Sequence, residues 1–135
     1  MTGCTDKVLR LYALDTPDTA ESYERVDYAK RKDGFMASAD AMQPSLKLTG
    51  QHKGAISSIV QLPSASSDLF LTGCADGGIR MYSLSSLSEE NDDPLCVFDQ
   101  GRTGVQQLCA MAENTFLSSG YDRNIRLWDV RAQDH

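Results

Sequence analysis

The sequence predicts an all-β fold made of repeated four-stranded antiparallel sheets. Three observations support it: a gapless triple repeat, short β-rich runs separated by turn residues, and no helical period of useful length outside residues 19–43. The chain has 135 residues, enough for one small domain or part of a larger one. With 41% hydrophobic and 24% charged residues, its ordinary composition argues against disorder of the whole chain.

The repeat is carried by a short motif in which Asp is followed by Leu or Ile three residues later, then Arg, Leu or Met, and an aromatic residue. Its copies are Asp6–Tyr12, Asp76–Tyr82 and Asp122–Trp128. The match continues upstream, where Thr-Gly-Cys occurs twice and Ser-Ser-Gly once. The arginines Arg10, Arg80 and Arg126 share one repeat position, which favours a common structural role over a functional arginine row.

Each unit contains the pattern of a strand, a tight turn and a strand. Asp and Gly in Ala75-Asp76-Gly77-Gly78 supply the backbone conformations that a hairpin turn needs. Alternation after the turn, and β-rich runs before it, give four strands per unit. The expected strands of the two later units are 46–49, 55–61, 69–72, 79–82, 95–98, 105–110, 116–118 and 125–130.

On these residues the chain resembles the WD-repeat family of β-propellers. The carrying motifs are Leu127-Trp128-Asp129 and His52-Lys-Gly-Ala-Ile56, with 24 residues from His52 to Asp76. The resemblance covers Thr2 to Leu14 and Leu46 to Val130, about two and a half repeats. It implies an all-β, partial β-propeller built of four-stranded antiparallel blades. Because propellers close with about 4–8 blades, we expect a piece of a larger propeller, or a ring that other chains complete.

The resemblance divides the chain into repeats, loops and a tail. The expected segments are 1–14, the end of a first WD repeat; 15–45, an acidic insertion loop; 46–84, the second repeat; 85–93, an acidic loop; 94–131, the third repeat; and 132–135, a tail. Part of the insertion, Ala20 to Lys32, has the pattern of an amphipathic helix and equally that of a disordered segment.

The family pattern also implies a structural hydrogen-bonded set of His, Ser or Thr, Asp and Trp in each unit. Carried over residue by residue, the set contains His52, Thr72, Asp76, Tyr82, Ser118, Asp122 and Trp128. Tyr82 replaces Trp in the second unit, and in the third the His position falls at Gly101 or Arg102. Such residues resemble a hydrolase triad in type. We interpret them as structural because a buried, bonded Asp avoids an unsatisfied-polar cost of about 1–3 kcal/mol.

No enzyme is expected, because the sequence lacks the serine-hydrolase, zinc-protease, phosphate-loop and EF-hand motifs. No metal site or cofactor is expected either, since the four cysteines have no close-paired spacing and are taken as small, reduced core residues. No apolar run has the length of a membrane span and no signal core is visible, so we expect a soluble cytoplasmic or nuclear protein with no membrane partner.

The charge of the chain indicates which classes of partner it can bind. The net charge is −6, which makes nucleic acid an unlikely partner because phosphate binding needs a positive surface. The two acidic segments hold eleven acidic and four basic residues, so they carry the whole negative charge. They are either solubilising loops or a docking or phosphorylation platform, in which Ser85, Ser86 and Ser88 precede Glu89-Glu90.

Three functions follow from the resemblance. The first is a protein-interaction scaffold that docks partner proteins or peptides on a rigid framework with variable loops. The second is a substrate receptor of a cullin–RING ubiquitin ligase, because the sixteen residues from Phe116 to Arg131 resemble the box that such receptors use. In it, the possible partner-binding residues are Asp122, Trp128, Asp129 and Arg131, with Arg131 contacting the ligase adaptor. The third is an RNA- or chromatin-associated scaffold.

Overall fold

The chain folds into three antiparallel sheets, and the all-β, partial-propeller architecture expected from the sequence is confirmed. The computed structural model describes residues 2–3, 5–11, 45–64, 68–88 and 90–132. Almost all of the predicted insertion at 15–45, with its candidate helix, lies outside the described residues, as do Tyr12 and most of the tail.

The middle sheet has four strands in the order β4-β5-β6-β7. These strands are Ile56–Gln61, Leu69–Cys74, Gly78–Ser83 and Cys96–Asp99. The expected Asp-Gly turn joins β5 to β6, and Gly77 takes a φ of 89°, a left-handed conformation that glycine adopts without steric cost. The register pairs Phe70 with Tyr82 and Thr72 with Arg80, so these four side chains lie on the same face of the sheet.

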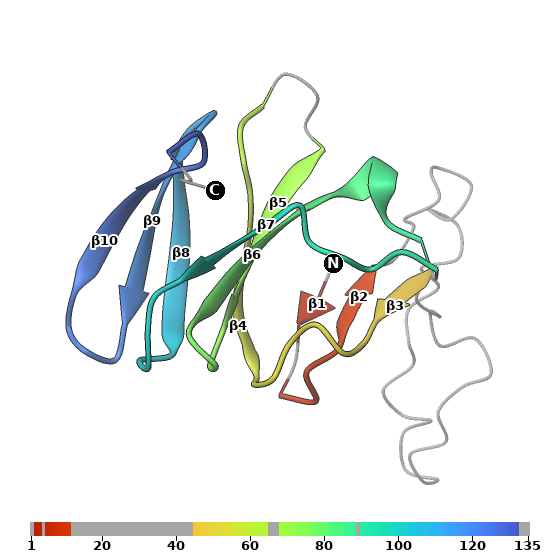
Figure 1. Cartoon of the computed structure of the whole chain (residues 1–135), viewed down its shortest axis with the longest axis horizontal. Helices are drawn as coiled ribbons and strands as arrows, with labels where there is room; N and C mark the ends of the chain where they lie inside the picture. Colours follow the sequence, from red (N-terminus) through yellow and green to blue (C-terminus); the bar gives the residue numbers. More distant parts are fainter. Residues whose placement is uncertain (1, 4, 12–44, 65–67, 89, 133–135) are drawn as a thin grey trace, which may run out of the picture.

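The flanking sheets each contain three strands among the described residues. The first, in the order β1-β2-β3, is formed by Thr2–Gly3, Leu9–Leu11 and Leu46–Leu48. The third, in the order β10-β9-β8, is formed by Val105–Ala112 (β8), Thr115–Gly120 (β9) and Ile125–Asp129 (β10). Figure 1 shows the three sheets side by side, each twisted like a propeller blade.

Two hydrophobic clusters join the sheets. One lies between the first and middle sheets; it contains Leu9, Leu48, Ile56, Phe70 and Tyr82. The other lies between the middle and third sheets and contains Leu62, Leu71, Ile79, Phe98, Val105, Leu108 and Phe116. A Cβ at Gly73 would lie 2.6 Å from Cγ1 of Val105, so a glycine there allows β5 and β8 to approach closely. Apolar packing against a neighbouring sheet therefore contributes to the stability of all three sheets.

The loop after β6 begins with a 3-10 turn, Leu84–Ser86, and contains the acidic residues predicted at 85–93. Leu87 packs against the first hydrophobic cluster. The Gln51 side chain donates hydrogen bonds to Asp92 and Asp93 at 3.2 and 3.1 Å. The later part of the loop is thereby held against the segment that enters β4.

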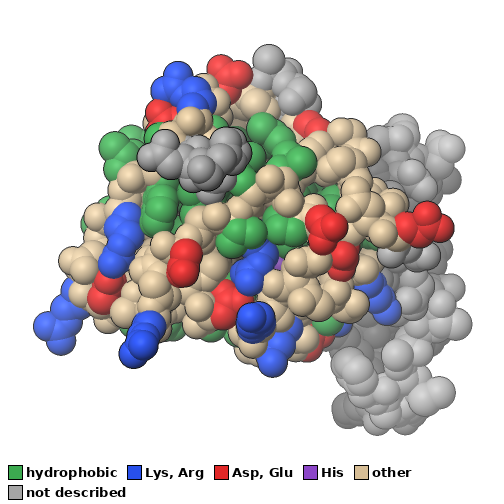
Figure 2. Space-filling model, viewed as in Figure 1, with side chains coloured by type: hydrophobic (Ala, Val, Ile, Leu, Met, Phe, Trp, Pro, Cys, Tyr) green, Lys and Arg blue, Asp and Glu red, His purple; other side chains and the backbone are tan. Residues whose placement is uncertain are grey.

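One end of the sheets is formed by tight turns and by the loops that enter the first strands. We call this end the turn face; it comprises residues 5–8, 51–55, 75–77, 100–104 and 121–124. These segments lie along the lower edge of Figure 1, and cationic side chains gather along the same edge in Figure 2. In the part of the chain that the structure describes, no helix has the length and apolar character needed to span a membrane.

Candidate functional site

Each sheet carries an ion pair between the Asp that opens its hairpin turn and the Arg four residues later. The pairs are Asp6–Arg10, Asp76–Arg80 and Asp122–Arg126. Their burial differs: Asp76 and Arg80 are 15% and 10% exposed, Asp122 and Arg126 are 19% and 30%, and Asp6 and Arg10 are 44% and 25%. The shared position of the arginines thus has the structural role that the repeat predicted, and the middle pair is the most desolvated.

Asp76 organises the middle turn. Its carboxylate accepts hydrogen bonds from the backbone N–H of Gly78 at 2.8 Å and of Lys53 at 3.0 Å, and from the Arg80 guanidinium at 2.9 Å. Burial alone would raise the pKa of Asp76, but these hydrogen bonds outweigh it and hold the pKa well below its ordinary value of 3.8. Asp76 therefore joins the turn, the loop before β4 and strand β6.

His52 and Thr72 form the buried polar pair expected in the second unit. Nε2 of His52 lies 2.8 Å from Oγ1 of Thr72, and the two residues are 4% and 0% exposed. The rest of the expected set is not joined to this pair. Nδ1 of His52 and the hydroxyl of Tyr82 have no hydrogen-bond partner, and Asp76 bonds to Arg80 rather than to His52. Tyr82 instead stacks on Phe70, with ring centroids 5.4 Å apart.

In the third sheet the set is completed by a residue that the sequence did not identify. The indole N–H of Trp128 donates to Ser118 Oγ at 2.8 Å, and the Ser118 hydroxyl donates to Oε1 of the buried Gln100 at 2.6 Å. The assignment of this place to Gly101 or Arg102 was wrong: both are exposed. The sequence does contain a signal for Gln100: it directly precedes the turn glycine Gly101, and its side-chain oxygen can accept a hydrogen bond from a hydroxyl group.

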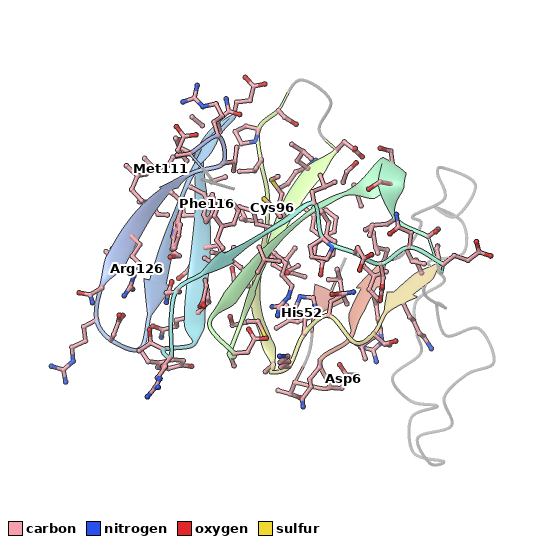
Figure 3. The ribbon with its side chains drawn as sticks, in the orientation of Figure 1. Asp6, His52, Cys96, Met111, Phe116 and Arg126 are labelled. Carbon is pink, nitrogen blue, oxygen red and sulfur yellow. The ribbon has the colours of Figure 1, made fainter. Side chains whose placement is uncertain are left out.

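Asp122 keeps its place in the third turn but does not join this chain of hydrogen bonds. It accepts hydrogen bonds from Arg126 and from the backbone and side chain of Asn124. The hydrogen bond from Arg126 is the main cause that holds the pKa of Asp122 below its ordinary value. The second and third units therefore each contain two separate polar groups, an Asp–Arg turn pair and an inner pair or triplet, rather than one continuous set. Figure 3 shows His52 of the second unit and Arg126 of the third.

The end of β10 presents the candidate partner-binding box. Trp128 stacks on Phe116 with centroids 6.1 Å apart and meets Phe98 edge-on at 5.7 Å. Asp129 accepts hydrogen bonds from the Arg131 guanidinium, from Nη2 at 2.7 Å and Nε at 3.0 Å. These bonds lower the pKa of Asp129 to about 2 and leave the Arg131 side chain 68% exposed. Asp122, placed in the same box, contacts Arg126 and not Arg131.

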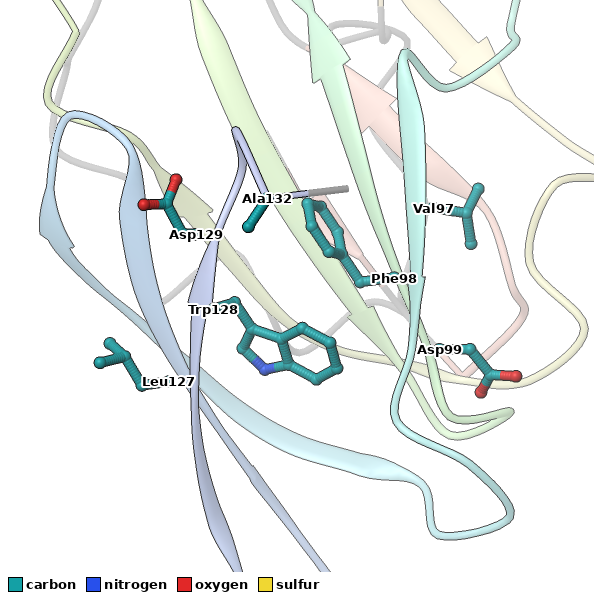
Figure 4. Close-up of a pocket in the computed structure, with 7 residues that line it drawn as sticks. All are labelled: Val97, Phe98, Asp99, Leu127, Trp128, Asp129 and Ala132. Atoms are coloured by element: carbon teal, nitrogen blue, oxygen red, sulfur yellow. The ribbon is translucent and has the colours of Figure 1, made fainter. Parts of the chain in front are cut away.

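A hollow lies between β7 and β10 beside this box (Figure 4). Its volume is about 330 Å³, and it is lined by Val97, Phe98, Asp99, Leu127, Trp128, Asp129 and Ala132. Within the described residues, no group of three or more His, Cys, Asp or Glu side chains could hold a metal ion. Cys74 is buried but Cys109 is exposed, so the expectation that all the cysteines are core residues was wrong.

The polar pair His52–Thr72 resembles a base and a nucleophile, yet its geometry does not suit catalysis. Thr72 is fully buried within the middle sheet, so no substrate atom can approach its hydroxyl. The pair instead satisfies polar groups that would destabilise the fold if left unpaired.

Lowering the pH should destabilise the chain through His52. Burial is the largest cause that lowers the pKa of His52, and the Arg80 charge adds to it; the pKa falls from 6.5 to about 4 although Asp76 opposes the shift. Between pH 6.5 and 4 the unfolded chain therefore binds a proton that the folded chain does not. This contribution of His52 to the free energy of unfolding is fully present above pH 6.5 and is lost as the pH falls, by roughly 2 kcal/mol at pH 5.

The variant His52→Gln is the matched control, because Gln100 fills the corresponding place in the third sheet. Urea unfolding at pH 7.5 and pH 5 should show a smaller loss of stability for the variant than for the wild type. An equal loss in both proteins would mean that His52 titrates normally in the folded chain.

Comparisons with known proteins agree with this geometry. A family model described as "WD domain, G-beta repeat" matches residues 42–83 and 93–129. The "Ribosome biogenesis protein WDR12 homolog" of Chlamydomonas reinhardtii is 30% identical over 83 residues, 58% of this chain and 19% of that protein, so the chain spans about a fifth of this curated relative. The crystal structure of the WD40 β-propeller domain of Doa1 matches in fold with a TM-score of 0.53 at 24% identity, covering 67% of this chain and 28% of that one. Since the family model covers more than half of the sequence, the chain belongs to the WD-repeat family.

Proposed function

We propose that the chain is a protein-interaction scaffold, a segment of a WD-repeat propeller that docks partner proteins or peptides. The observation that supports it most is the placement of its polar groups. The residues that resemble catalytic groups, His52, Thr72 and Ser118, are buried and bonded to one another or to Gln100. The side chains left exposed lie on turns and strand faces of a rigid framework, which is how a binding scaffold presents its contacts.

The scaffold proposal is tested with purified components. The chain as it occurs in the cell is cross-linked to the proteins bound to it, and each recovered partner protein is identified and purified. The dissociation constant of the complex between that partner and the chain is then measured by calorimetry. We expect a saturable complex that Lys47→Ala leaves intact, because Lys47 is exposed in the outer strand β3. Leu71→Asp should abolish the complex, because Leu71 is fully buried between two sheets. If no recovered protein binds the purified chain, the proposal is wrong.

A second candidate function, supported by the geometry of Arg131, is that of a substrate receptor for a cullin–RING ubiquitin ligase. Asp129 holds the guanidinium of Arg131 through two side-chain hydrogen bonds while most of that side chain stays exposed. A fixed, exposed guanidinium suits a bidentate contact with a partner's carboxylate or carbonyl groups. In this candidate function, Arg131 contacts the ligase adaptor and Asp129 positions it.

The relative from Chlamydomonas reinhardtii supports one setting for such a scaffold. Its description places that protein in ribosome biogenesis. A role of this kind would suit the third function considered from the sequence, an RNA-associated scaffold that acts through protein contacts. The negative net charge of the chain favours protein partners over direct binding of an RNA backbone.

A further inference from the structure

Charges are unevenly distributed over the described residues. Apart from Lys47 and Arg131, every described Lys and Arg lies on or beside the turn face. Three of them, Arg10, Arg80 and Arg126, pair with the turn aspartates. The others are exposed, and within the described residues they form no ion pair: Lys7, Lys53, Arg102 and Arg123.

These four cations occupy successive loops at one end of the molecule. Lys7 and Arg123 lie in the turns of the first and third sheets, and Lys53 and Arg102 lie in the loops that enter β4 and β8. The loops that carry Lys53 and Arg102 both contact the middle turn: the backbone N–H of Lys53 donates a hydrogen bond to Asp76, and a Cβ at Gly77 would lie 2.1 Å from the carbonyl oxygen of Gly101. The four cations therefore lie in a row of loops at the same end of three neighbouring sheets. Lys and Arg side chains gather along the lower edge of Figure 2, where these loops lie in Figure 1.

The backbone of the turns adds a second, independent observation. Lys7 and Arg123 have φ angles of 67° and 65°, in the left-handed region that favours glycine. The corresponding residue of the middle turn is Gly77, with a φ of 89°. Two of the three turns thus place a cation where glycine would fit with less strain. Strain of this kind is expected where the side chain itself has a function.

The aspartates of the turn face do not cancel these charges. Asp6, Asp76 and Asp122 are each neutralised by their own arginine, and Asp99, at the end of β7 beside this face, is an acidic side chain that forms no ion pair among the described residues. Because the free cations are exposed and spread over separate loops, their field extends into solvent within a Debye length of about 10 Å. Such a field attracts an acidic partner and increases its rate of association.

We infer that the turn face binds an acidic segment of a partner protein through Lys7, Lys53, Arg102 and Arg123. This inference rests on the proposed scaffold function and names the chemistry of the partner. A protein segment fits better than a nucleic acid backbone. Each of the four cations lies in a different loop, and carboxylates lie between them, whereas binding of a phosphate backbone requires a continuous positive surface. Spaced Asp or Glu side chains of an extended peptide match separate cations.

The test uses a fluorescein-labelled peptide of alternating Glu and Gly, and measures its anisotropy with the full chain at low and high salt. We expect saturable binding that weakens as salt increases. The double variant Lys53→Glu/Arg123→Glu should weaken binding by at least about tenfold. The charge-matched control Lys47→Glu/Arg131→Glu reverses the two cations outside the turn face and should weaken it far less.

The variant Arg123→Gly separates binding from folding. Glycine relieves the left-handed strain, so the urea midpoint should stay equal or rise, while binding of the peptide should still weaken. A purely structural role for Arg123 would leave the binding unchanged.

Four results would overturn the inference: no binding of the peptide, equal loss in both double variants, tighter binding of a single-stranded oligonucleotide through the same cations, or self-association that the turn-face variant abolishes. The third and fourth would assign the surface to nucleic acid or to a second copy of the chain. If a purified partner protein binds but is insensitive to both double variants, the scaffold function stands and this inference alone falls.

Discussion

Replacing Asp76 by Ala should destabilise the chain by about 3 kcal/mol or more in urea unfolding. The substitution removes the acceptor for the backbone N–H groups of Lys53 and Gly78, and it leaves the Arg80 guanidinium unpaired at 10% exposure. An unpaired buried charge and two lost backbone hydrogen bonds act in the same direction. The expected loss is a large fraction of the stability of a small domain.

The other sheets supply matched controls for Asp76→Ala, since the same turn pair occurs there at greater exposure. We expect the loss of stability to decrease from Asp76→Ala to Asp122→Ala to Asp6→Ala, in the order in which the three pairs become more exposed. Asp68 in a loop is unsuitable as a control, because it accepts hydrogen bonds from Ser83 and Ser85. Equal unfolding midpoints for the three variants would contradict the role assigned to burial.

A double variant tests whether the unpaired charge dominates. In Asp76→Ala/Arg80→Met the guanidinium is removed with its partner, so part of the lost stability should return. If the double variant is no more stable than Asp76→Ala, the backbone hydrogen bonds account for the effect. Where Asp76→Ala prevents folding, Asp76→Asn retains one carbonyl acceptor and allows the comparison to be made.

The positions of the strands could be predicted from local chemistry. Turn residues and alternating apolar residues placed the strand before the Asp-Gly turn at 69–72, and β5 spans Leu69–Cys74. The third-unit strand expected at 125–130 is β10, Ile125–Asp129. Such signals act over a few residues, so they are visible in one sequence. The all-β class and the repeat followed from them.

The hydrogen-bond partners could not be predicted in the same way. The family resemblance grouped Asp76 with His52. In the structure the Asp76 carboxylate instead accepts hydrogen bonds from Arg80, which follows the same tight turn. Gln100 was missed because its side chain has no imidazole ring like that of His52. Both side chains nevertheless form a hydrogen bond with a hydroxyl group of the second strand of their unit, Thr72 for His52 and Ser118 for Gln100. The row of free cations was missed as well, because it joins loops that are distant in sequence and adjacent only in the folded chain.

Replacing Arg131 by Ala should abolish recovery of the ligase adaptor if the Trp128–Arg131 box is used, since a loss of about thirtyfold or more in affinity is typical of an arginine anchor. Folding should be unchanged because Arg131 is 68% exposed and contacts only Asp129 among the described ion pairs. Arg131→Lys should also weaken recovery, because lysine keeps the charge but lacks the planar fork that binds two oxygen atoms at once.

The structure adds a positioning variant to this prediction. Asp129→Ala removes both hydrogen bonds to the Arg131 guanidinium while leaving Arg131 in place. Adaptor binding should then weaken less than in Arg131→Ala, because the guanidinium remains present but must be ordered when the complex forms. Arg123→Ala removes the same charge from the turn of the same sheet and should leave the adaptor bound, which distinguishes the box from the turn face.

The measurement is co-purification from cell extract with the chain as it occurs in the cell, followed by titration with purified adaptor. If the wild type does not bind the adaptor, or if both Arg131 variants bind as well as the wild type, the ligase function is excluded and the general scaffold function remains.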